Sequence, residues 1–435
     1  MIRARSAEPV PGRPNTHRAP RGNAPRAFVT GGAGFGVLAF VAVAVRAKPL
    51  VLGPALAPET VATIHLLTLG FLTSVMMGAL YQWVPVITGQ ALAHERWAWI
   101  HGVLHGLGVG WFVAGLATTT PWAVAAGGLL LVVGIMFFLV NMGETMAASA
   151  WPRPASLRFV ATGLATLALA AVAGAAMALP LAGMSATVAP ARILPVHLIF
   201  AVGGWLGMTL IGVSWRLFPL FWGVKPRMAG LFPAWAAGVA GIGFGAVGVL
   251  GDVVPLEMAG AAMGAAALVV WLFRLAGVWR RRPRDAALDG AKGLMAAAPP
   301  ALVASLAAGV RCWLAGRWLD GVILVLIGGI SLPMLAYLQR ILPFMTWLAA
   351  SRRWRRAPHL PALWPASWSW HVSAVAVAGF VVLTAGFVST EPWLVTTGAL
   401  AEAAAWGGLV LGAARMARLS HPPAPGLRAR SGSSR

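Results

Sequence analysis

Residues 64–86 read IHLLTLGFLTSVMMGALYQWVPV, a run of 23 residues without one fully charged side chain. About 20 such residues in a helix cross the hydrocarbon layer of a bilayer. Similar windows recur along the chain from Phe28 almost to Arg415, and the sequence therefore predicts an all-α integral membrane protein of about twelve transmembrane helices. We expect these helices to begin near Phe28, Thr60, Trp97, Pro121, Ser156, Ala191, Gly230, Val254, Gly293, Arg317, Ser367 and Trp393.

The composition agrees with lipid as the main solvent. Of the 435 residues, 59% are hydrophobic and only 10% are charged, which is too apolar for one water-soluble core. The single cysteine, Cys312, excludes disulfide frameworks, cysteine-rich metal sites and the CxxCH attachment of c-type heme. Within the ninth window, Pro299 and Pro300 favour a helix end over a helix middle, because proline kinks a helix.

The distribution of Lys and Arg predicts the topology, because basic loops stay in the cytoplasm. Of the 33 basic residues, 26 fall in the two tails and in the connections after the even-numbered helices. We therefore expect a disordered basic cytoplasmic tail over 1–26, a twelve-helix membrane domain over 27–418 and a cytoplasmic tail over 419–435, in the cell (inner) membrane. The net charge of +22 lies in tails and loops, which favours contact with the lipid bilayer and argues against nucleic acid as a partner.

Three of the predicted helices end in related phrases: GALYQWVPVITG, GVSWRLFPLFWG and AYLQRILPFMTW. The shared prolines, Pro85, Pro219 and Pro343, are 134 and 124 residues apart, which predicts three repeated units of four helices. A major-facilitator transporter would instead divide into two halves of six helices. Small residues in register before each proline predict close approach of helices two, six and ten around a shared centre.

This architecture, with His65 opening helix two and His197 opening helix six, resembles subunit I of the heme-copper oxidases, and the cbb3-like branch and NnrS-type membrane proteins in particular. The resemblance runs from about Phe28 to Arg418. It implies that His65 is a ligand of a b-type heme and that His197 is a ligand of copper, both near the outer membrane face. The alternative for both histidines is a hydrogen bond to a backbone carbonyl at a helix end.

The chain departs from this family at the centre that reduces oxygen. Helix ten, from Arg317 to Leu348, and helix seven, from Gly230 to Leu250, contain no histidine, whereas the resemblance implies heme and copper ligands on both. The sequence thus predicts against oxygen reduction and leaves any other enzymatic activity open.

A second pair of histidines lies on helix three. His101 and His105 are four residues apart, so both rings lie on one helix face, and two imidazoles at this spacing can share one metal ion. Ordinary helix packing is the alternative for both residues.

Three other polar residues fall inside predicted membrane helices. Arg216 and Arg340 could bind an anion or a heme propionate, or extend to lipid phosphates at the cytoplasmic end. Glu402, near the middle of helix twelve, could relay protons or be a neutral, hydrogen-bonded packing residue.

The preferred function is a non-oxidase relative of oxidase subunit I that binds heme b or copper in respiration, metal handling or the nitric-oxide response. One alternative is a polytopic transporter whose polar path is gated by Arg216 and Arg340. The other is an assembly partner of respiratory-complex subunits that holds no cofactor.

Overall fold

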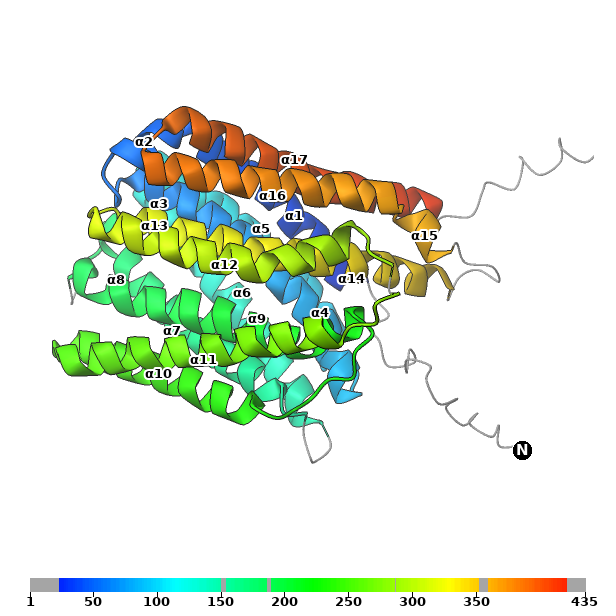
Figure 1. The fold of residues 1–435 in the computed structure, drawn as a ribbon. Coiled ribbons are helices and arrows are strands. Elements are labelled where there is room, and N and C mark those ends of the chain that lie inside the picture. The colour runs from blue at the N-terminus through cyan, green and yellow to red at the C-terminus, as the bar shows by residue number, and fades with distance from the viewer. Residues whose placement is uncertain (1–22, 150–153, 186–188, 286, 352–358, 421–435) are drawn as a thin grey trace, which may run out of the picture.

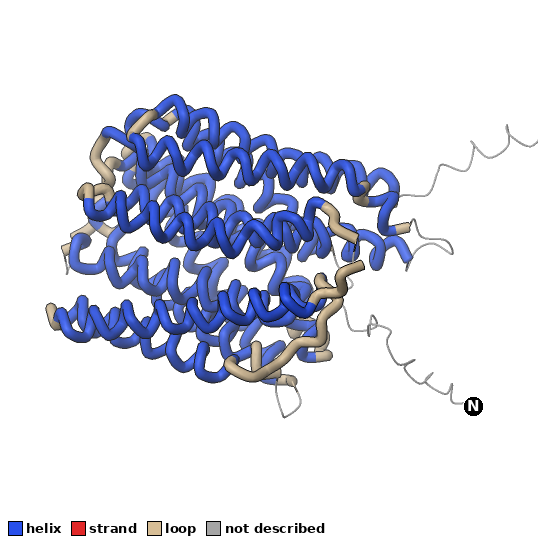
Figure 2. Tube along the Cα trace, viewed as in Figure 1, coloured by secondary structure: helices blue, strands red, loops and turns tan. Residues whose placement is uncertain are grey.

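The computed structural model describes residues 23–149, 154–185, 189–285, 287–351 and 359–420. In these residues the chain forms helices joined by short loops, without a β-strand (Figure 2). The long helices lie side by side in one bundle (Figure 1). Of the two predicted tails, residues 1–22 and 421–435 lie outside the described residues, and the first helix already begins at Ala24.

Twelve helices are long and apolar enough to cross a membrane, which confirms the predicted number of spans. Each begins within four residues of its predicted start. Their bounds are Ala24–Val45, Pro58–Thr88, Glu95–Ala117, Pro121–Ala147, Leu157–Ala178, Pro190–Phe221, Leu231–Gly251, Val254–Arg281, Gly290–Leu314, Trp318–Ser351, Ala366–Ser389 and Pro392–Leu419.

Apolar side chains also face outward along these spans, as expected for a protein in contact with lipid. Leu129 on the fourth span and Phe273 on the eighth are 65% and 72% exposed. A water-soluble protein seldom exposes such extended apolar surface, so the lipid bilayer is the environment that this multi-pass protein fits.

Nine of the spans are unbroken α-helices. They are α1 (Ala24–Val45), α5 (Glu95–Ala117), α6 (Pro121–Ala147), α7 (Leu157–Ala178), α10 (Leu231–Gly251), α11 (Val254–Arg281), α12 (Gly290–Leu314), α16 (Ala366–Ser389) and α17 (Pro392–Leu419). The ninth span is confirmed, but Pro299 and Pro300 lie inside α12 and not at the expected helix end, and the helix continues past both. Short helices α2 (Ala47–Leu52), η3 (Pro180–Ala182) and α15 (Leu360–Leu363) lie in the connections.

The second, sixth and tenth spans, which carry the related phrases, each contain a π-helical segment between two α-helical ones. The second span is α3 (Pro58–His65), η2 (Leu66–Thr73) and α4 (Ser74–Thr88). The sixth is α8 (Pro190–Leu198), η4 (Ile199–Met208) and α9 (Thr209–Phe221), and the tenth is α13 (Trp318–Leu324), η5 (Val325–Ser331) and α14 (Leu332–Ser351). A π-helical turn is rare and is frequent at functional sites. All three segments end about twelve residues before the shared proline.

These three spans contact one another at the centre of the bundle. The indole Nε1 of Trp205 on η4 donates to Thr73 on η2 at 3.0 Å, and the Tyr337 hydroxyl on α14 donates to Ser214 on α9 at 3.0 Å. Trp406 on α17 completes the set, because its indole donates to Ser331 on η5 and its ring lies edge-on, 4.4 Å from the ring of Phe71 on η2.

The glycines in register on these helices have a different role from the one expected. A Cβ at Gly78 would lie 2.7 Å from the Cβ of Phe28 on α1, and one at Gly212 would lie 2.5 Å from the Cβ of Phe159 on α7. Each glycine therefore makes room for the helix that precedes its own span. The prediction that these small residues bring the second, sixth and tenth spans against each other was wrong.

Three helical hairpins, α5–α6, α10–α11 and α16–α17, share one close-packed geometry. A Cβ on the first glycine of each hairpin would lie 2.6 Å from a backbone nitrogen of the partner helix. A second glycine follows twelve residues later in every case, and a Cβ there would lie 2.2 to 2.4 Å from a backbone nitrogen of the first helix. The glycine pairs are Gly115 and Gly127, Gly248 and Gly260, and Gly386 and Gly398.

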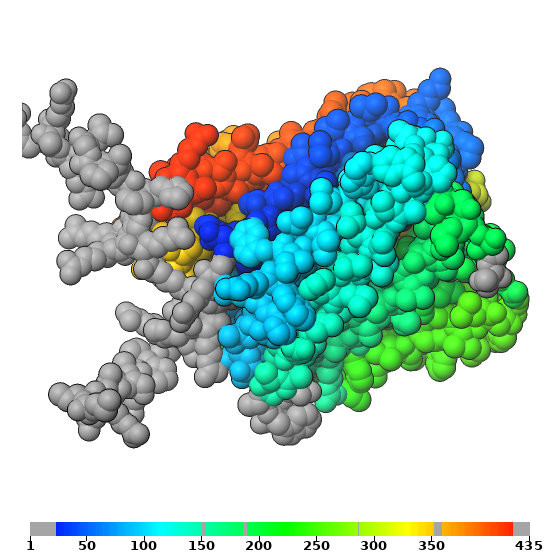
Figure 3. Space-filling view, turned by 180° about the vertical axis from the view of Figure 1, so that it is seen from behind, coloured from blue at the N-terminus to red at the C-terminus, as the bar shows by residue number. Residues whose placement is uncertain are grey.

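The turns of the three hairpins are also alike. Each contains a left-handed residue four positions after the first glycine, namely Thr119, Asp252 and Thr390, the non-glycine residues with positive φ in the described chain. The next helix begins two residues later each time, at Pro121, Val254 and Pro392. Each hairpin is held by contacts between neighbours in the sequence. Two of the hairpins also pack along a further helix: α6 lies along α7, and α17 lies along α1 (Figure 3).

Candidate functional site

His65 and His197 come from different spans and meet at one end of the bundle. His65 is the last residue of α3, directly before η2, and His197 lies two residues before the start of η4. Their ring centroids lie 6.5 Å apart, with an angle of 32° between the ring planes. Two histidines to which the resemblance gives separate heme and copper roles therefore lie at one site.

Both rings are held by the same kind of hydrogen bond. Nδ1 of His65 lies 2.8 Å from the carbonyl oxygen of Val61, and Nδ1 of His197 lies 3.0 Å from that of Ala170 on α7. A carbonyl oxygen only accepts, so Nδ1 carries the proton in both rings. The expected bond to a backbone carbonyl is present, and it leaves Nε2 of each neutral ring with a free lone pair. This is the arrangement in which proteins present histidine to a metal.

The neighbours of the pair fix the rings without enclosing them. Phe112 on α5 meets His65 edge-on, with centroids 5.4 Å apart. A Cβ at Gly174 on α7 would lie 3.1 Å from Cε1 of His197, so glycine makes room for that ring. Both histidines are nevertheless only half-buried. Their free nitrogens are thus held in place but remain open to a ligand.

The separation of the two rings is close to the largest that one metal ion could bridge. A metal–nitrogen bond to histidine is about 2.0 Å and a ring nitrogen lies about 1.1 Å from the ring centroid, so two rings that bind one metal have centroids at most about 6.2 Å apart. The observed separation is 6.5 Å. His65 and His197 would hold one heme iron or copper ion where their Nε2 atoms face each other.

His101 and His105 form a second cluster of histidines, which is fully buried and lies nearer the start of α5 than Phe112. Nδ1 of His101 lies 3.0 Å from the hydroxyl of Tyr81, and Nε2 of His105 donates to the carbonyl oxygen of Leu69 on η2 at 3.1 Å. Phe28 packs over both rings. The remaining nitrogens, His101 Nε2 and His105 Nδ1, are buried without a hydrogen bond in the described chain. The two histidines lie together as predicted, but their free nitrogens are enclosed.

The same Leu69 carbonyl also accepts from the hydroxyl of Ser74 at 3.3 Å. A π-helical turn interrupts the regular ladder of backbone hydrogen bonds, which frees carbonyl oxygens for side chains. Segment η2 thus places a histidine at its start and binds another through its backbone.

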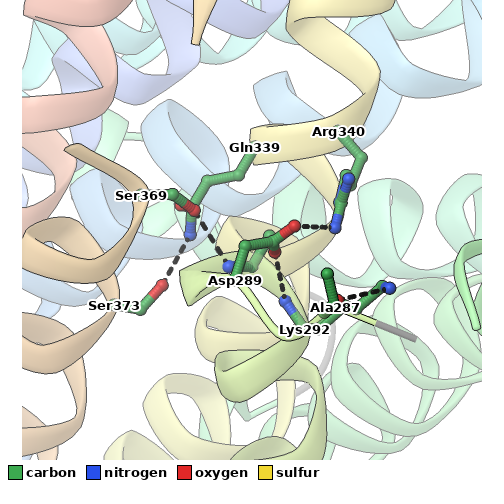
Figure 4. Close-up of polar contacts among 8 residues, drawn as sticks. Ala287, Asp289, Lys292, Gln339, Arg340, Ser369 and Ser373 are labelled. Atoms are coloured by element: carbon green, nitrogen blue, oxygen red, sulfur yellow. Dashed lines mark hydrogen bonds and ion pairs between the residues drawn. The ribbon is translucent and has the colours of Figure 1, made fainter. Parts of the chain in front are cut away.

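Arg340 lies in a polar network between α12, α14 and α16 (Figure 4). Its guanidinium forms an ion pair with Asp289, whose other carboxylate oxygen accepts from the backbone nitrogen of Lys292 at the start of α12. The adjacent Gln339 accepts from Ser369 at 2.7 Å and donates to Ser373 at 3.0 Å. Asp289 was not identified from the sequence, since nothing in its local context marks it as a partner for a residue 51 positions away.

Arg216, at the corresponding position of the sixth span, has no acidic partner among the described residues. It is half-buried on α9, and its Nε is buried without a hydrogen bond in the part of the chain that the structure describes. The two arginines that the repeat aligns therefore have different surroundings.

Glu402 lies on α17 and is completely buried. Neither of its carboxylate oxygens has a hydrogen-bond partner among the described residues. Glu402 is thus a buried packing residue, without the expected hydrogen bond in the described chain. A buried carboxyl group without a partner is far less costly when it is neutral.

No protein-family model matches this chain, and no curated protein matches it either. Within the described ranges, His, Cys, Asp and Glu side chains do not gather in groups of three or more that could hold a metal ion. Among the described residues, His65 and His197 are the pair of histidines on different spans whose rings lie together at one end of the bundle.

Proposed function

We propose that this multi-pass membrane protein holds one redox centre, a b-type heme, between His65 and His197. The observation that carries the proposal is the 6.5 Å separation of two half-buried rings whose Nδ1 atoms are both bound to carbonyl oxygens. Heme iron accepts two opposed neutral imidazoles, and when bound it would supply one-electron redox chemistry or a site for a diatomic gas. Copper with two opposed histidines is the alternative that the same separation permits.

The three matching hairpins and the three π-containing spans support the prediction of three four-helix units. Such a threefold arrangement supports the proposed relationship to heme-copper oxidase subunit I, which this chain resembles in the helix and depth of His65 and His197. The basic residues after even-numbered spans support cytoplasmic termini and the inner membrane as the location. In that orientation the histidine pair lies toward the outer face.

The proposed role excludes oxygen reduction as its chemistry. The seventh and tenth spans contain no histidine, so a second heme and its copper partner would lack ligands from them. Electron transfer, handling of heme or copper, or sensing of nitric oxide requires only one centre.

The two other functions have less support. In the transporter hypothesis Arg216 and Arg340 gate a polar path, but Arg340 is neutralised by Asp289 and lies against α12. An assembly partner of respiratory-complex subunits would have no need for two histidines whose Nε2 atoms are both free.

The test is a reduced-minus-oxidised visible spectrum of the detergent-purified protein, with metal analysis of the same sample. We expect the α band of a b-type heme and about one iron per chain, both lost in His65→Ala and in His197→Ala. His371→Ala is the matched control, because that ring is exposed on α16 and also bonds a carbonyl oxygen, that of Ser367. Copper without heme would assign the site to copper, and a colourless, metal-free protein from heme-replete cells would overturn the proposal.

A further inference from the structure

Three arginine side chains gather around the segment that joins α9 to α10. Arg227 lies within this segment, and Arg274 and Arg281 lie near the end of α11. The Arg281 guanidinium donates to the carbonyl oxygen of Lys225 at 3.4 Å. That of Arg274 packs on Gly230, where an added Cβ would lie 3.0 Å from its Nε. The positive charges of Arg227 and Arg274 both repel that of Arg281, so the three residues form one arginine cluster.

The arginine cluster has no acidic partner among the described residues. Two carboxylates follow α11 in the sequence, but Asp289 pairs with Arg340, and Asp285 is exposed and pairs with none of the three arginines in the described chain. Like charges that are held together repel one another, and an anion between them removes that cost. The cluster is therefore a site that a negatively charged ligand would stabilise.

The cluster lies at one end of the bundle, where both charged and apolar groups face outward. Arg274 precedes the end of α11 by seven residues, about 10 Å along the helix axis. Phe273, its neighbour in the sequence, is 72% exposed, and Phe232, two residues after Gly230, is 56% exposed. A ligand here would meet guanidinium groups near the surface of the bilayer and apolar side chains within it, which are the two environments that a phospholipid needs.

We propose that the arginine cluster binds the headgroup of an anionic phospholipid that carries two phosphates. Guanidinium groups bind phosphate oxygens through paired hydrogen bonds, and basic pockets between transmembrane helices bind lipid headgroups. Arg274 and Arg281 lie two turns apart on one face of α11, so each can take one phosphate. Two phosphates also match the three positive charges more closely than the single phosphate of an ordinary phospholipid does.

This proposal goes beyond the redox centre, because the cluster and the histidine pair lie at opposite ends of the sixth span. His197 lies near the start of that span, and the segment that carries Arg227 follows its last residue, Phe221. We expect lipid binding in protein with or without heme, so the two proposals fail separately.

The experiment measures binding of tetraoleoyl diphosphatidylglycerol to the full-length protein in detergent by native mass spectrometry. Arg274→Gln and Arg281→Gln should each weaken binding about fivefold or more, because each removes a charged contact with phosphate. Dioleoyl phosphatidylglycerol, which has one phosphate, should bind about fivefold more weakly than the two-phosphate lipid.

Arg418→Gln is the matched control. It removes the same charge from an exposed side chain in the last turn of α17, which lies on the other side of the bundle from α11 (Figure 1). Its affinity for the two-phosphate lipid should change less than about twofold, because this residue adds only to the general positive charge of the protein.

Thermal unfolding in detergent without anionic lipid checks that the variants fold. Removal of one of several mutually repelling charges should leave the melting temperature unchanged or raise it. Addition of the two-phosphate lipid should then raise the melting temperature of the unaltered protein and of Arg418→Gln, but much less in Arg274→Gln and Arg281→Gln. A lower melting temperature in both cluster variants without lipid would contradict the proposal, since the arginines would then have partners within the protein.

Three further results would overturn the proposal. Equal affinity in Arg281→Gln and in the unaltered protein would place the lipid elsewhere. Equal affinity for the two lipids would mean that the site does not recognise a second phosphate. Displacement of the lipid by inorganic pyrophosphate that binds as tightly by itself would assign the cluster to a soluble phosphate compound.

Discussion

His65 and His197 are 132 residues apart in the chain, and their ring centroids are 6.5 Å apart in the fold. Because the rings share one site, the loss of either should abolish the whole cofactor signal. We expect His65→Ala, His197→Ala and the double variant to have the same low heme and metal content per chain. Retention of half the content in each single variant would instead indicate two separate sites.

The ion pair of Arg340 with Asp289 should stabilise the fold, because both side chains are mostly buried, with 32% and 25% exposed. Asp289→Asn leaves the guanidinium without a counter-charge and should cost about 1–2 kcal/mol, less than for a fully enclosed pair since water still reaches it. Thermal unfolding of the purified protein in detergent measures this cost.

The exposed pair of Arg192 with Asp252 is the matched control for that experiment. Its side chains are 57% and 75% exposed, and Asn suits the left-handed backbone of residue 252. Asp252→Asn should therefore change the unfolding free energy by less than about 0.5 kcal/mol. Equal losses in the two variants would mean that burial of the Arg340 pair contributes nothing.

Glu402 should be replaceable by an apolar side chain of similar length. Since neither oxygen has a partner, Glu402→Met removes two buried polar atoms and should leave the melting temperature unchanged or raise it. Glu402→Gln adds amide hydrogens without acceptors and should cost about 1–3 kcal/mol. A large loss of stability or of activity in Glu402→Met would show that the carboxyl group has a partner or carries protons.

The hairpin glycines should tolerate no side chain. A Cβ at Gly127 would lie 2.2 Å from the backbone nitrogen of Phe112, so Gly127→Ala must push α5 and α6 apart and should cost about 3 kcal/mol or more. At the adjacent Gly128 the nearest atom is 3.9 Å from an added Cβ. Gly128→Ala should therefore be neutral or stabilising by up to about 1 kcal/mol. Similar melting temperatures for the two variants would contradict the packing described.

Much of this fold could be predicted because lipid imposes a simple rule on sequence. Windows of about 20 residues with few or no charged side chains predicted all twelve spans, and each predicted start lies within four residues of the observed one. The hairpin signal was also present, since glycines recur twelve residues apart at Gly115 and Gly127 and again in the other two hairpins, but it becomes recognisable only when the close contacts are seen.

The histidine site was harder to predict, because it depends on the direction in which each side chain points around its helix axis. His65 and His197 differ by two positions when the repeat is aligned on Pro85 and Pro219, which argues against a symmetric pair in regular α-helices. The intervening segments are π-helical and differ in length, 8 residues in η2 and 10 in η4. No residue type marks a π turn clearly enough for its effect on the facing of a side chain to be read from sequence.

A π turn is what an α-helix becomes when one residue is inserted without lengthening the span. A π turn therefore holds one more residue than an α-helical turn, and residues before it are rotated relative to where a regular α-helix of the same sequence would place them. His65 lies directly before η2, and His197 lies just before η4. The meeting of the two rings is thus a property of the backbone path through these spans as well as of the residue types at positions 65 and 197.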